Sequence, residues 1–263
     1  MTAAVRIGPA SALRQSLALA GRGVVRIRKN PDTLLDVTVQ PILMLLLFSF
    51  LFSGAIADGD HAGYLQQLVP GLMVFGTLYV SVGTGVALCT DVAKGVFDRF
   101  RSLPIARSAP LAGAVLGDVV RYLIAVLVLL VVGVVLGFRV QTGPLPVVAA
   151  MALMVAFGLC LCWVSVLVGL LVRSPAAVPG LLFAVIMPLS FGSSVFVPAA
   201  TMPDWLRVWA EVNVVTLLSE VNRGLLVTGT VPGGALLGAL MWMAGFVLVF
   251  FPLAARAYRR RLT

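Results

Sequence analysis

Long apolar runs alternate with short polar segments along most of this 263-residue chain. Six of the runs are long enough to cross the hydrocarbon core of a bilayer, which takes about 20 residues in a helix. The pattern therefore predicts an all-α integral membrane protein with six transmembrane helices. The predicted spans are residues 34–53, 68–90, 116–138, 145–172, 177–197 and 234–254.

The segment before the first span is basic and has a helical pattern. Between Ser11 and Lys29 apolar residues recur at spacings of three and four, and the basic residues collect on the other side. This predicts an interfacial amphipathic helix that lies on anionic lipid, and a packed soluble helix is the alternative. The expected division is 1–33 as the N-terminal region, 34–255 as the transmembrane domain and 256–263 as a basic tail.

Residues 198–229 are too hydrophobic for a free loop and too charged for a span. Trp205 and Trp209 are four residues apart, so a short helix would present both to the outer membrane interface. A second short helix from about residue 216 would place Glu220 and Arg223 within pairing distance, because they are three apart. We therefore expect two short outer helices before the last span.

Two charged residues lie near the inner end of the third predicted span. Asp118 and Arg121 are three apart, which permits an ion pair on one helix face and lowers the cost of placing both charges near hydrocarbon. A structural pair is the favoured interpretation, and a substrate site is the alternative.

The fifth predicted span contains a proline, Pro188, close to its outer end. Proline removes a backbone hydrogen bond, and nearby hydroxyl groups can satisfy the carbonyl that it frees. The hydroxyl residues that follow are Ser190, Ser193 and Ser194. A kinked, partly polar segment would suit a substrate path or a moving part, and a purely structural role remains equally open.

Composition supports the membrane assignment, since 60% of residues are hydrophobic and only 11% are charged. The net charge of +9 does not indicate nucleic-acid binding, because the basic residues gather at the ends of apolar runs. With both termini inside, the only Lys or Arg residues in outer segments are Arg139, Arg207 and Arg223. The positive-inside rule therefore predicts a multi-pass protein with cytoplasmic termini.

The sequence contains little that could support catalysis. Its single histidine, His61, and its three cysteines, Cys89, Cys160 and Cys162, have no metal-ligand spacing, so no metal site is expected. The phosphate-binding pattern GxxxxGK[ST] and the hydrolase patterns HExxH and GxSxG are absent. We expect no enzyme in this chain, and six spans suggest half of a larger pathway and hence a dimer.

Charged residues are densest between the second and third spans, in the stretch DVAKGVFDRFRSLPIAR at 91–107. A short amphipathic helix in this polar segment could dock on a soluble partner. The alternative is a solvated, positively charged loop that only fixes the topology.

The pattern DxxxGxxDRFRSLPxxR in this stretch resembles the first cytoplasmic loop of ABC-2 type permeases, especially the daunorubicin-resistance (DrrB-like) drug exporters. In that family the loop carries a coupling helix that binds a separate ATPase subunit. The resemblance implies docking roles for Asp91, Lys94, Gly95, Asp98, Arg99, Arg101, Pro104 and Arg107. The pattern FVPxxxMPxWL, followed by Asn213 and Thr216, is similar to the family's outer re-entrant helices. Val214 stands where the family usually has proline, which leaves the turn between these helices open.

The resemblance implies the membrane (permease) subunit of an ATP-binding cassette exporter in a bacterial plasma membrane. Such a subunit moves a hydrophobic or amphipathic drug, antibiotic or lipid outward and can confer multidrug or antibiotic resistance. The implied partners are two copies of a cytosolic ATPase, which bind the ATP and magnesium, and a second permease copy. Alternatives are export of a lipid-linked glycan and a non-transporting membrane immunity or assembly protein.

Overall fold

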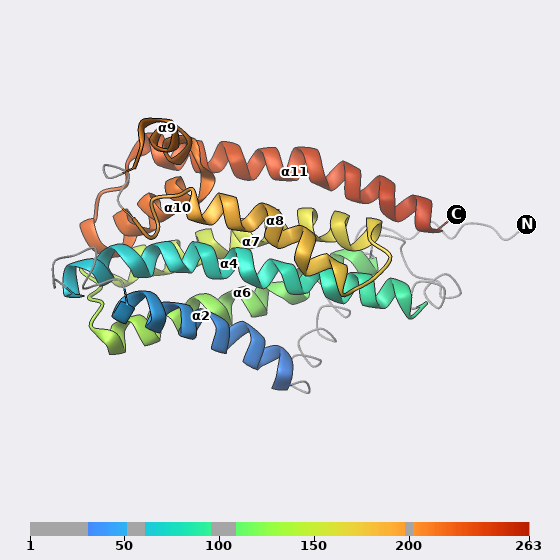
Figure 1. Ribbon diagram of the computed structural model, residues 1–263, viewed down its shortest axis with the longest axis horizontal. Coiled ribbons are helices and arrows are strands. Elements are labelled where there is room, and N and C mark those ends of the chain that lie inside the picture. Colours follow the sequence, from blue (N-terminus) through green and yellow to red (C-terminus); the bar gives the residue numbers. More distant parts are fainter. Residues whose placement is uncertain (1–30, 52–60, 96–108, 198–201, 263) are drawn as a thin grey trace, which may run out of the picture.

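The computed structural model describes residues 31–51, 61–95, 109–197 and 202–262, and every regular element in this part of the chain is a helix. Figure 1 shows an elongated bundle with α9 and α10 near one end and the C-terminus at the other. The elements are α2 (Pro31–Leu51), α4 (His61–Ala93), α6 (Ala109–Leu136), α7 (Pro144–Leu171), α8 (Ala177–Phe191), α9 (Asp204–Val212), α10 (Val214–Arg223), the π-helix η2 (Gly224–Thr228) and α11 (Gly233–Leu262). The predicted N-terminal interfacial helix lies outside the described residues.

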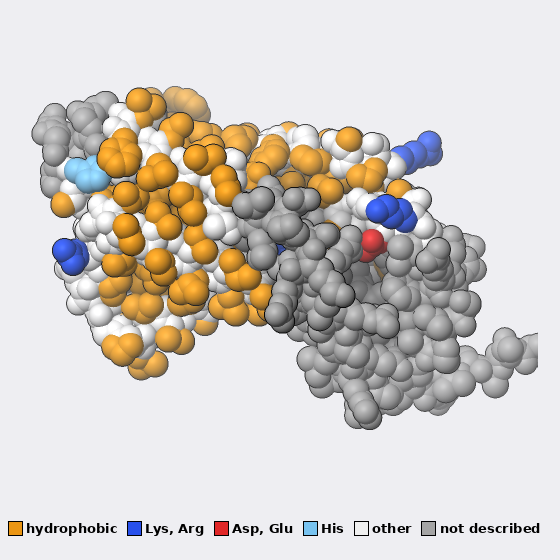
Figure 2. Space-filling view, turned by 90° about the horizontal axis from the view of Figure 1, so that it is seen from below, with side chains coloured by type: hydrophobic (Ala, Val, Ile, Leu, Met, Phe, Trp, Pro, Cys, Tyr) orange, Lys and Arg blue, Asp and Glu red, His pale blue; other side chains and the backbone are white. Residues whose placement is uncertain are grey.

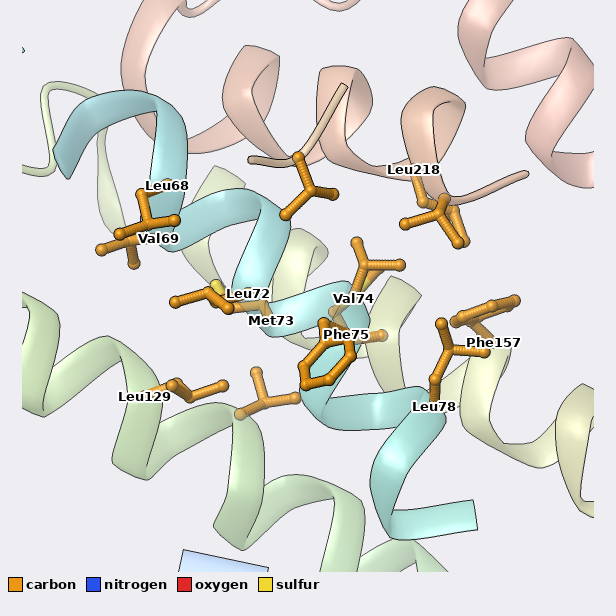
Figure 3. Close-up of a cluster of buried hydrophobic side chains, with 14 of the residues drawn as sticks. Leu68, Val69, Leu72, Met73, Val74, Phe75, Leu78, Leu129, Phe157 and Leu218 are labelled. Atoms are coloured by element: carbon orange, nitrogen blue, oxygen red, sulfur yellow. The ribbon is translucent and has the colours of Figure 1, made fainter. Parts of the chain in front are cut away.

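Helix α4 is the central element of the bundle. It packs against α2, α6, α7, α8 and α10, and its apolar side chains are buried along most of its length. Figure 3 shows the middle of this core, where Leu72, Phe75 and Leu78 of α4 lie among side chains such as Leu129, Phe157 and Leu218. A helix that is apolar on all sides is typical of such a central position.

Helices α4 and α7 approach each other closely because glycine faces glycine where they cross. A Cβ atom built on Gly169 would lie 2.5 Å from the carbonyl oxygen of Gly85, and one built on Gly85 would lie 2.9 Å from the Ser165 carbonyl oxygen. Small residues allow this backbone contact between membrane helices. The crossing lies in the half of α4 that leads to residues 91–107.

Four helices in the described residues are long and apolar enough to cross a membrane: His61–Ala93, Gly117–Leu136, Pro144–Leu171 and Gly233–Tyr258. They correspond to the second, third, fourth and sixth predicted spans. The apolar parts of the other two predicted spans are shorter, at Thr38–Leu51 and Ala177–Phe191.

Helix α8 ends earlier than the sequence predicts. Its 15 residues rise about 22 Å, less than the roughly 30 Å of a hydrocarbon core. The helix stops one turn after Pro188, where Gly192 N–H donates to the Pro188 carbonyl at 2.9 Å. The remaining predicted residues, 192–197, form turns.

Helix α4 begins at His61, before the start of the second predicted span at residue 68. The helix continues through Pro70, which lacks an N–H and so leaves one carbonyl of the preceding turn without its usual donor. The extra turns bring Tyr64 and Leu65 into the core.

The outside of the bundle is hydrophobic. In Figure 2 apolar side chains cover most of the described surface, and Lys and Arg side chains stand out near its two ends. Exposed large side chains include Leu47 and Phe50 of α2, Val135 of α6 and Leu248 of α11. Such a surface suits a multi-pass protein whose outer face contacts lipid.

Candidate functional site

One end of the bundle, which we call the coupling end, is formed by the C-terminal turns of α4, α7 and α11. Leu88 of α4, Leu170 of α7 and Tyr258 of α11 belong to one buried cluster there. The charged segment 91–107 starts at this end. Exposed basic side chains at the coupling end are Lys94, Arg173, Arg256 and Arg260.

The helix α4 stops before most of the charged segment. Its last helical residue is Ala93, after which Lys94 N–H donates to Thr90 O at 2.9 Å and Gly95 N–H donates to Val92 O at 3.1 Å. Gly95 has a φ of +65°, the left-handed conformation in which helices commonly end at glycine. The chain therefore leaves the path of α4 at Gly95, and the predicted short helix in segment 91–107 stays a prediction.

The structure places three of the residues to which the resemblance assigns docking roles. Asp91 lies in the last turn of α4 and is half-buried, Lys94 is exposed, and Gly95 forms the turn described above. The other five, Asp98, Arg99, Arg101, Pro104 and Arg107, lie outside the described residues. Their docking roles stay predictions.

A group of buried polar side chains, the α4–α6 polar cluster, lies inside the bundle near the coupling end. Arg121 Nη1 donates to Asp118 Oδ1 at 2.8 Å, the contact that the three-residue spacing predicts. Thr84 Oγ1 of α4 donates to Asp118 Oδ2 at 2.6 Å. Arg121 Nη2 also points to α4, where it donates to Val80 O at 3.4 Å. The ion pair of α6 is thus bonded across to α4.

Helix α7 adds Cys162 to the α4–α6 polar cluster, next to Tyr122 of α6. Cys162 Sγ lies 3.2 Å from the hydroxyl of Tyr122, which is completely buried, and 3.8 Å from Asp118 Oδ2. Two glycines make room for the large side chains. A Cβ atom on Gly83 would clash with Arg121 Nη2, and one on Gly158 would lie only 2.7 Å from the Tyr122 ring. Three helices therefore meet at the cluster.

The polar cluster is only partly satisfied. Arg121 is 8% exposed and Asp118 is 7% exposed, yet Arg121 Nε has no hydrogen-bond partner among the described residues. Placing an arginine at the centre of a membrane helix costs about 2.5–3.5 kcal/mol on insertion scales, and a counter-charge offsets part of this cost. The arrangement is not the one that stability alone would select, because a buried pair with unmet donors is less stable than a well-packed apolar group.

The opposite end, which we call the α9 end, carries the two predicted outer helices. Trp205 and Trp209 lie on α9 and are 74% and 44% exposed, so both indole rings are available to a membrane interface. Asp204 and Arg207 form an exposed ion pair at 3.6 Å. Helix α9 is thus a surface helix with aromatic side chains facing outward.

The turn between α9 and α10 is held by Asn213. Its Oδ1 atom accepts from Val215 N–H at 2.9 Å, which caps the first turn of α10. Its Nδ2 atom donates to Leu189 O at 2.7 Å and to Gly192 O at 3.2 Å. The sequence does not predict the form of this turn, because Val214 stands where the family usually has proline. In the structure Asn213 forms the turn by capping α10 and by binding the end of α8.

The predicted substrate-path residues lie at this junction. Pro188 is exposed in the last turn of α8, whereas Ser190, Ser193 and Ser194 are buried. Ser193 donates to Ser190 O, and Ser194 N–H donates to Thr216 Oγ1 at 3.0 Å. The buried Ser190 hydroxyl has no hydrogen-bond partner among the described residues. A role of the three serines in a substrate path stays a prediction.

The predicted pair Glu220 and Arg223 shares one face of α10, but the nitrogen atoms Nε and Nη2 of Arg223 are buried without a hydrogen-bond partner among the described residues. The expected ion pair is not made through these two atoms. Burial raises the pKa of the Glu220 carboxyl, although the charge of Arg223 opposes this shift. Burial also lowers the pKa of Arg223, and Glu220 partly restores it.

The π-helix η2 follows α10 directly and is bound by the turn between α6 and α7. Thr142 Oγ1 donates to Leu225 O at 2.7 Å, and Gln141 N–H donates to Leu226 O at 3.0 Å. Gly229 ends η2 with a φ of +72°. Among the described residues no group of three or more His, Cys, Asp or Glu side chains is arranged to hold a metal ion.

The fold and the charged segment at its coupling end agree with a comparison of the sequence with protein families. The model of the ABC-2 type transporter family matches residues 14–227. The chain therefore belongs to the ABC-2 type transporter family, as the resemblance in segment 91–107 predicts.

Among individual proteins, the chain is similar to the daunorubicin resistance ABC transporter permease protein DrrB1 of Streptomyces coeruleorubidus. The two are 37% identical over 261 residues, which cover 99% of this chain and 92% of the relative. The probable doxorubicin resistance permease protein DrrC of Mycobacterium tuberculosis is 25% identical over 95% of this chain and 90% of the relative. A putative transport permease, ycf38 of Cyanophora paradoxa, is 27% identical over 81% of this chain and 74% of the relative.

Proposed function

We propose that this chain is the permease subunit of an ABC exporter that moves a hydrophobic or amphipathic compound out of the cell. The observation that carries the proposal is the similarity to a daunorubicin resistance permease over 99% of the chain. The apolar outer surface and the basic coupling end support the same function. Relatives named for daunorubicin and doxorubicin make these two drugs the first substrates to test.

In the proposed topology α2 and α8 complete the first and fifth of six spans, and both termini lie in the cytoplasm. The exposed basic side chains at the coupling end support this orientation, because the positive-inside rule assigns them to the cytoplasmic face. The aromatic side chains of α9 would then lie in the outer interface. Two permease copies would form the membrane part, since six spans make half of a pathway.

The energy for transport would come from a separate ATPase subunit, which binds ATP and magnesium. ATPase closure would displace the segment that joins α4 to α6 and so favour one of two arrangements of the bundle. This chain would supply the path for the substrate. Residues near Ser190, Ser193 and Ser194 remain candidates for its polar lining.

The proposal is tested by co-purification of the chain with its candidate ATPase in detergent, followed by daunorubicin efflux from cells that express both. We expect the wild type to retain the ATPase and to lower drug accumulation. The double variant Arg99→Glu/Arg101→Glu should lose the ATPase while remaining folded. Arg139→Glu is the matched control, because Arg139 is an exposed arginine at the other end of the bundle.

Two results would contradict the proposal. If folded wild-type protein retains no ATPase and gives no efflux, the chain is better explained as a non-transporting immunity or assembly protein. If the ATPase is retained but drug accumulation is unchanged while a lipid-linked glycan accumulates inside cells that lack the chain, glycan export becomes the better function.

A further inference from the structure

The two helices that flank segment 91–107 are bonded to each other inside the bundle. Thr84 of α4 and Asp118 of α6 form the 2.6 Å hydrogen bond between them, and Arg121 adds the contact to Val80 O. Thr84 precedes Asp91 by two helical turns, or about 10 Å along the axis. These bonds therefore lie close to the point where the proposed ATPase would act.

The bonds differ in kind from the rest of the α4–α6 contact. Much of that contact is made by apolar side chains such as Leu72, Phe75 and Leu129, whose attraction is not directional. A hydrogen bond to a carboxylate is directional and stronger than a neutral one. In hydrocarbon it also has no water to replace it if the helices shift.

Several features accommodate the buried charges of Asp118 and Arg121 at a cost to packing and stability. Glycine at position 83 leaves room for the Arg121 guanidinium, and glycine at position 158 leaves room for Tyr122. Arg121 Nε remains buried without a hydrogen-bond partner in the described part of the chain. An apolar pair would pack here without this cost, which points to a role other than stability.

We propose that Thr84, Asp118 and Arg121 are positioning residues that hold α4 and α6 together as one unit, so that movement of the segment between them is transmitted to both helices. The inference rests on the proposed function, since it concerns how ATPase movement reaches the bundle. A positioning role of this kind requires no contact with ATP or substrate. Their effect is on coupling, and binding of the ATPase does not depend on them.

The test compares two buried threonines of α4, one that donates to another helix and one that donates within its own helix. Thr84→Val removes the bond to Asp118 and keeps the shape of the side chain. Thr77→Val is the matched control, because Thr77 is also buried but donates within α4, to Met73 O at 2.8 Å. Thr84→Ser retains the hydroxyl and serves as the conservative replacement.

Three quantities are measured for each variant: ATPase retained on purification, thermal stability in detergent, and daunorubicin efflux per retained complex. We expect Thr84→Val to retain the ATPase but to lose about fivefold or more in efflux, the size of a modest coupling free energy. Thr84→Ser and Thr77→Val should stay close to wild type. Arg121→Lys, which keeps the charge but is too short to reach both Asp118 and Val80 O, should also reduce efflux and provides a second variant if Thr84→Val does not fold.

The outcomes separate this inference from the function on which it rests. Normal efflux in Thr84→Val or, if that variant does not fold, in Arg121→Lys would overturn the positioning role and leave the exporter intact. An equal loss in Thr77→Val would also overturn it, because the effect would then come from helix stability. Loss of the ATPase from Thr84→Val would assign the cluster to docking and reject the role stated here. Failure of the wild type to retain an ATPase would instead remove the proposed function itself.

Discussion

The α4–α6 polar cluster near the coupling end and the turn at Asn213 at the α9 end both bury polar side chains, but they do so with different chemistry. At the coupling end a charged pair of α6 is buried against neutral polar groups of α4 and α7, and one arginine nitrogen has no partner among the described residues. At the α9 end Asn213 is neutral and makes three hydrogen bonds to backbone groups.

The difference follows from where helices end. Short helices such as α9 and α10 leave several N–H and C=O groups without intrahelical partners, and Asn213 and Thr216 bond such groups. Long helices have no such groups in their middle, so the buried ion pair there has no capping role. The comparison suggests that neutral side chains at the α9 end fix backbone, whereas charged side chains at the coupling end fix helices against each other.

The largest effect is expected from Asp118→Ala, which leaves Arg121 buried without its counter-charge. Breaking a buried pair in this way destabilises a protein by about 3–5 kcal/mol. The free energy of unfolding, measured by denaturant titration in micelles, should fall accordingly. In the double variant Asp118→Leu/Arg121→Met stability should return while efflux stays low, and recovery of both would contradict the coupling role.

A smaller effect is expected from Asn213→Ala at the other end. This variant removes the cap of α10 and leaves the carbonyls of Leu189 and Gly192 without a donor, which costs about 1–3 kcal/mol. Asn213→Ser should recover the part due to the cap, since serine is also a good capping residue. Equal unfolding free energies for Asn213→Ala and wild type would show that the α9 end does not depend on this side chain.

The helix crossing at the coupling end offers a third test. Gly169→Ala places a Cβ atom against the Gly85 carbonyl, so α4 and α7 must separate, at a cost of about 1–3 kcal/mol. Gly180→Ala in α8 is the control, because a Cβ there meets no atom within 4 Å. The melting temperature should drop for the first variant and stay level or rise for the second, and similar values for both would contradict the crossing as described.

The smallest effect is expected from Asp204→Ala. The Asp204–Arg207 pair is exposed and its charged atoms are 3.6 Å apart, and such surface pairs contribute about 1 kcal/mol or less. The melting temperature in detergent should therefore remain within error of wild type. A drop as large as that of Asn213→Ala would show that α9 depends on its charges as well as on its cap.

The apolar pattern predicts the helices well and their limits less well. Hydropathy locates α4, α6, α7 and α11, because each is a long uninterrupted run. It misses the first turns of α4, since polar residues such as Gln66 and Gln67 can continue a helix beyond the hydrocarbon. It also extends α8 through residues 192–197, because a hydropathy count does not show that the chain turns after Pro188 and Gly192.

Sequence spacing predicts contacts between residues of one helix, but it does not predict contacts between residues of different helices. Asp118 and Arg121 are found because they are three apart on α6, but Thr84 and Cys162 are separated from them by dozens of residues. The sequence signal for these contacts between helices was the presence of glycine in apolar runs, at Gly83 and Gly158. Each glycine leaves room for a large side chain from another helix. Gly95 was likewise assigned only to docking, although its place after a helix is typical of a C-terminal cap.

The π-helix η2 has a consequence for which parts of the chain can change length. A π-turn contains more residues than an α-turn, and its carbonyls do not line up with the donors of an ordinary helix. Two of these carbonyls, those of Leu225 and Leu226, are bonded by Thr142 and Gln141. Most short turns between helices tolerate deletions. A deletion between Arg139 and Gly143, however, would remove the hydrogen-bond donors that bind the carbonyls of η2. The turn between α6 and α7 is therefore one of the described connections that are least free to vary.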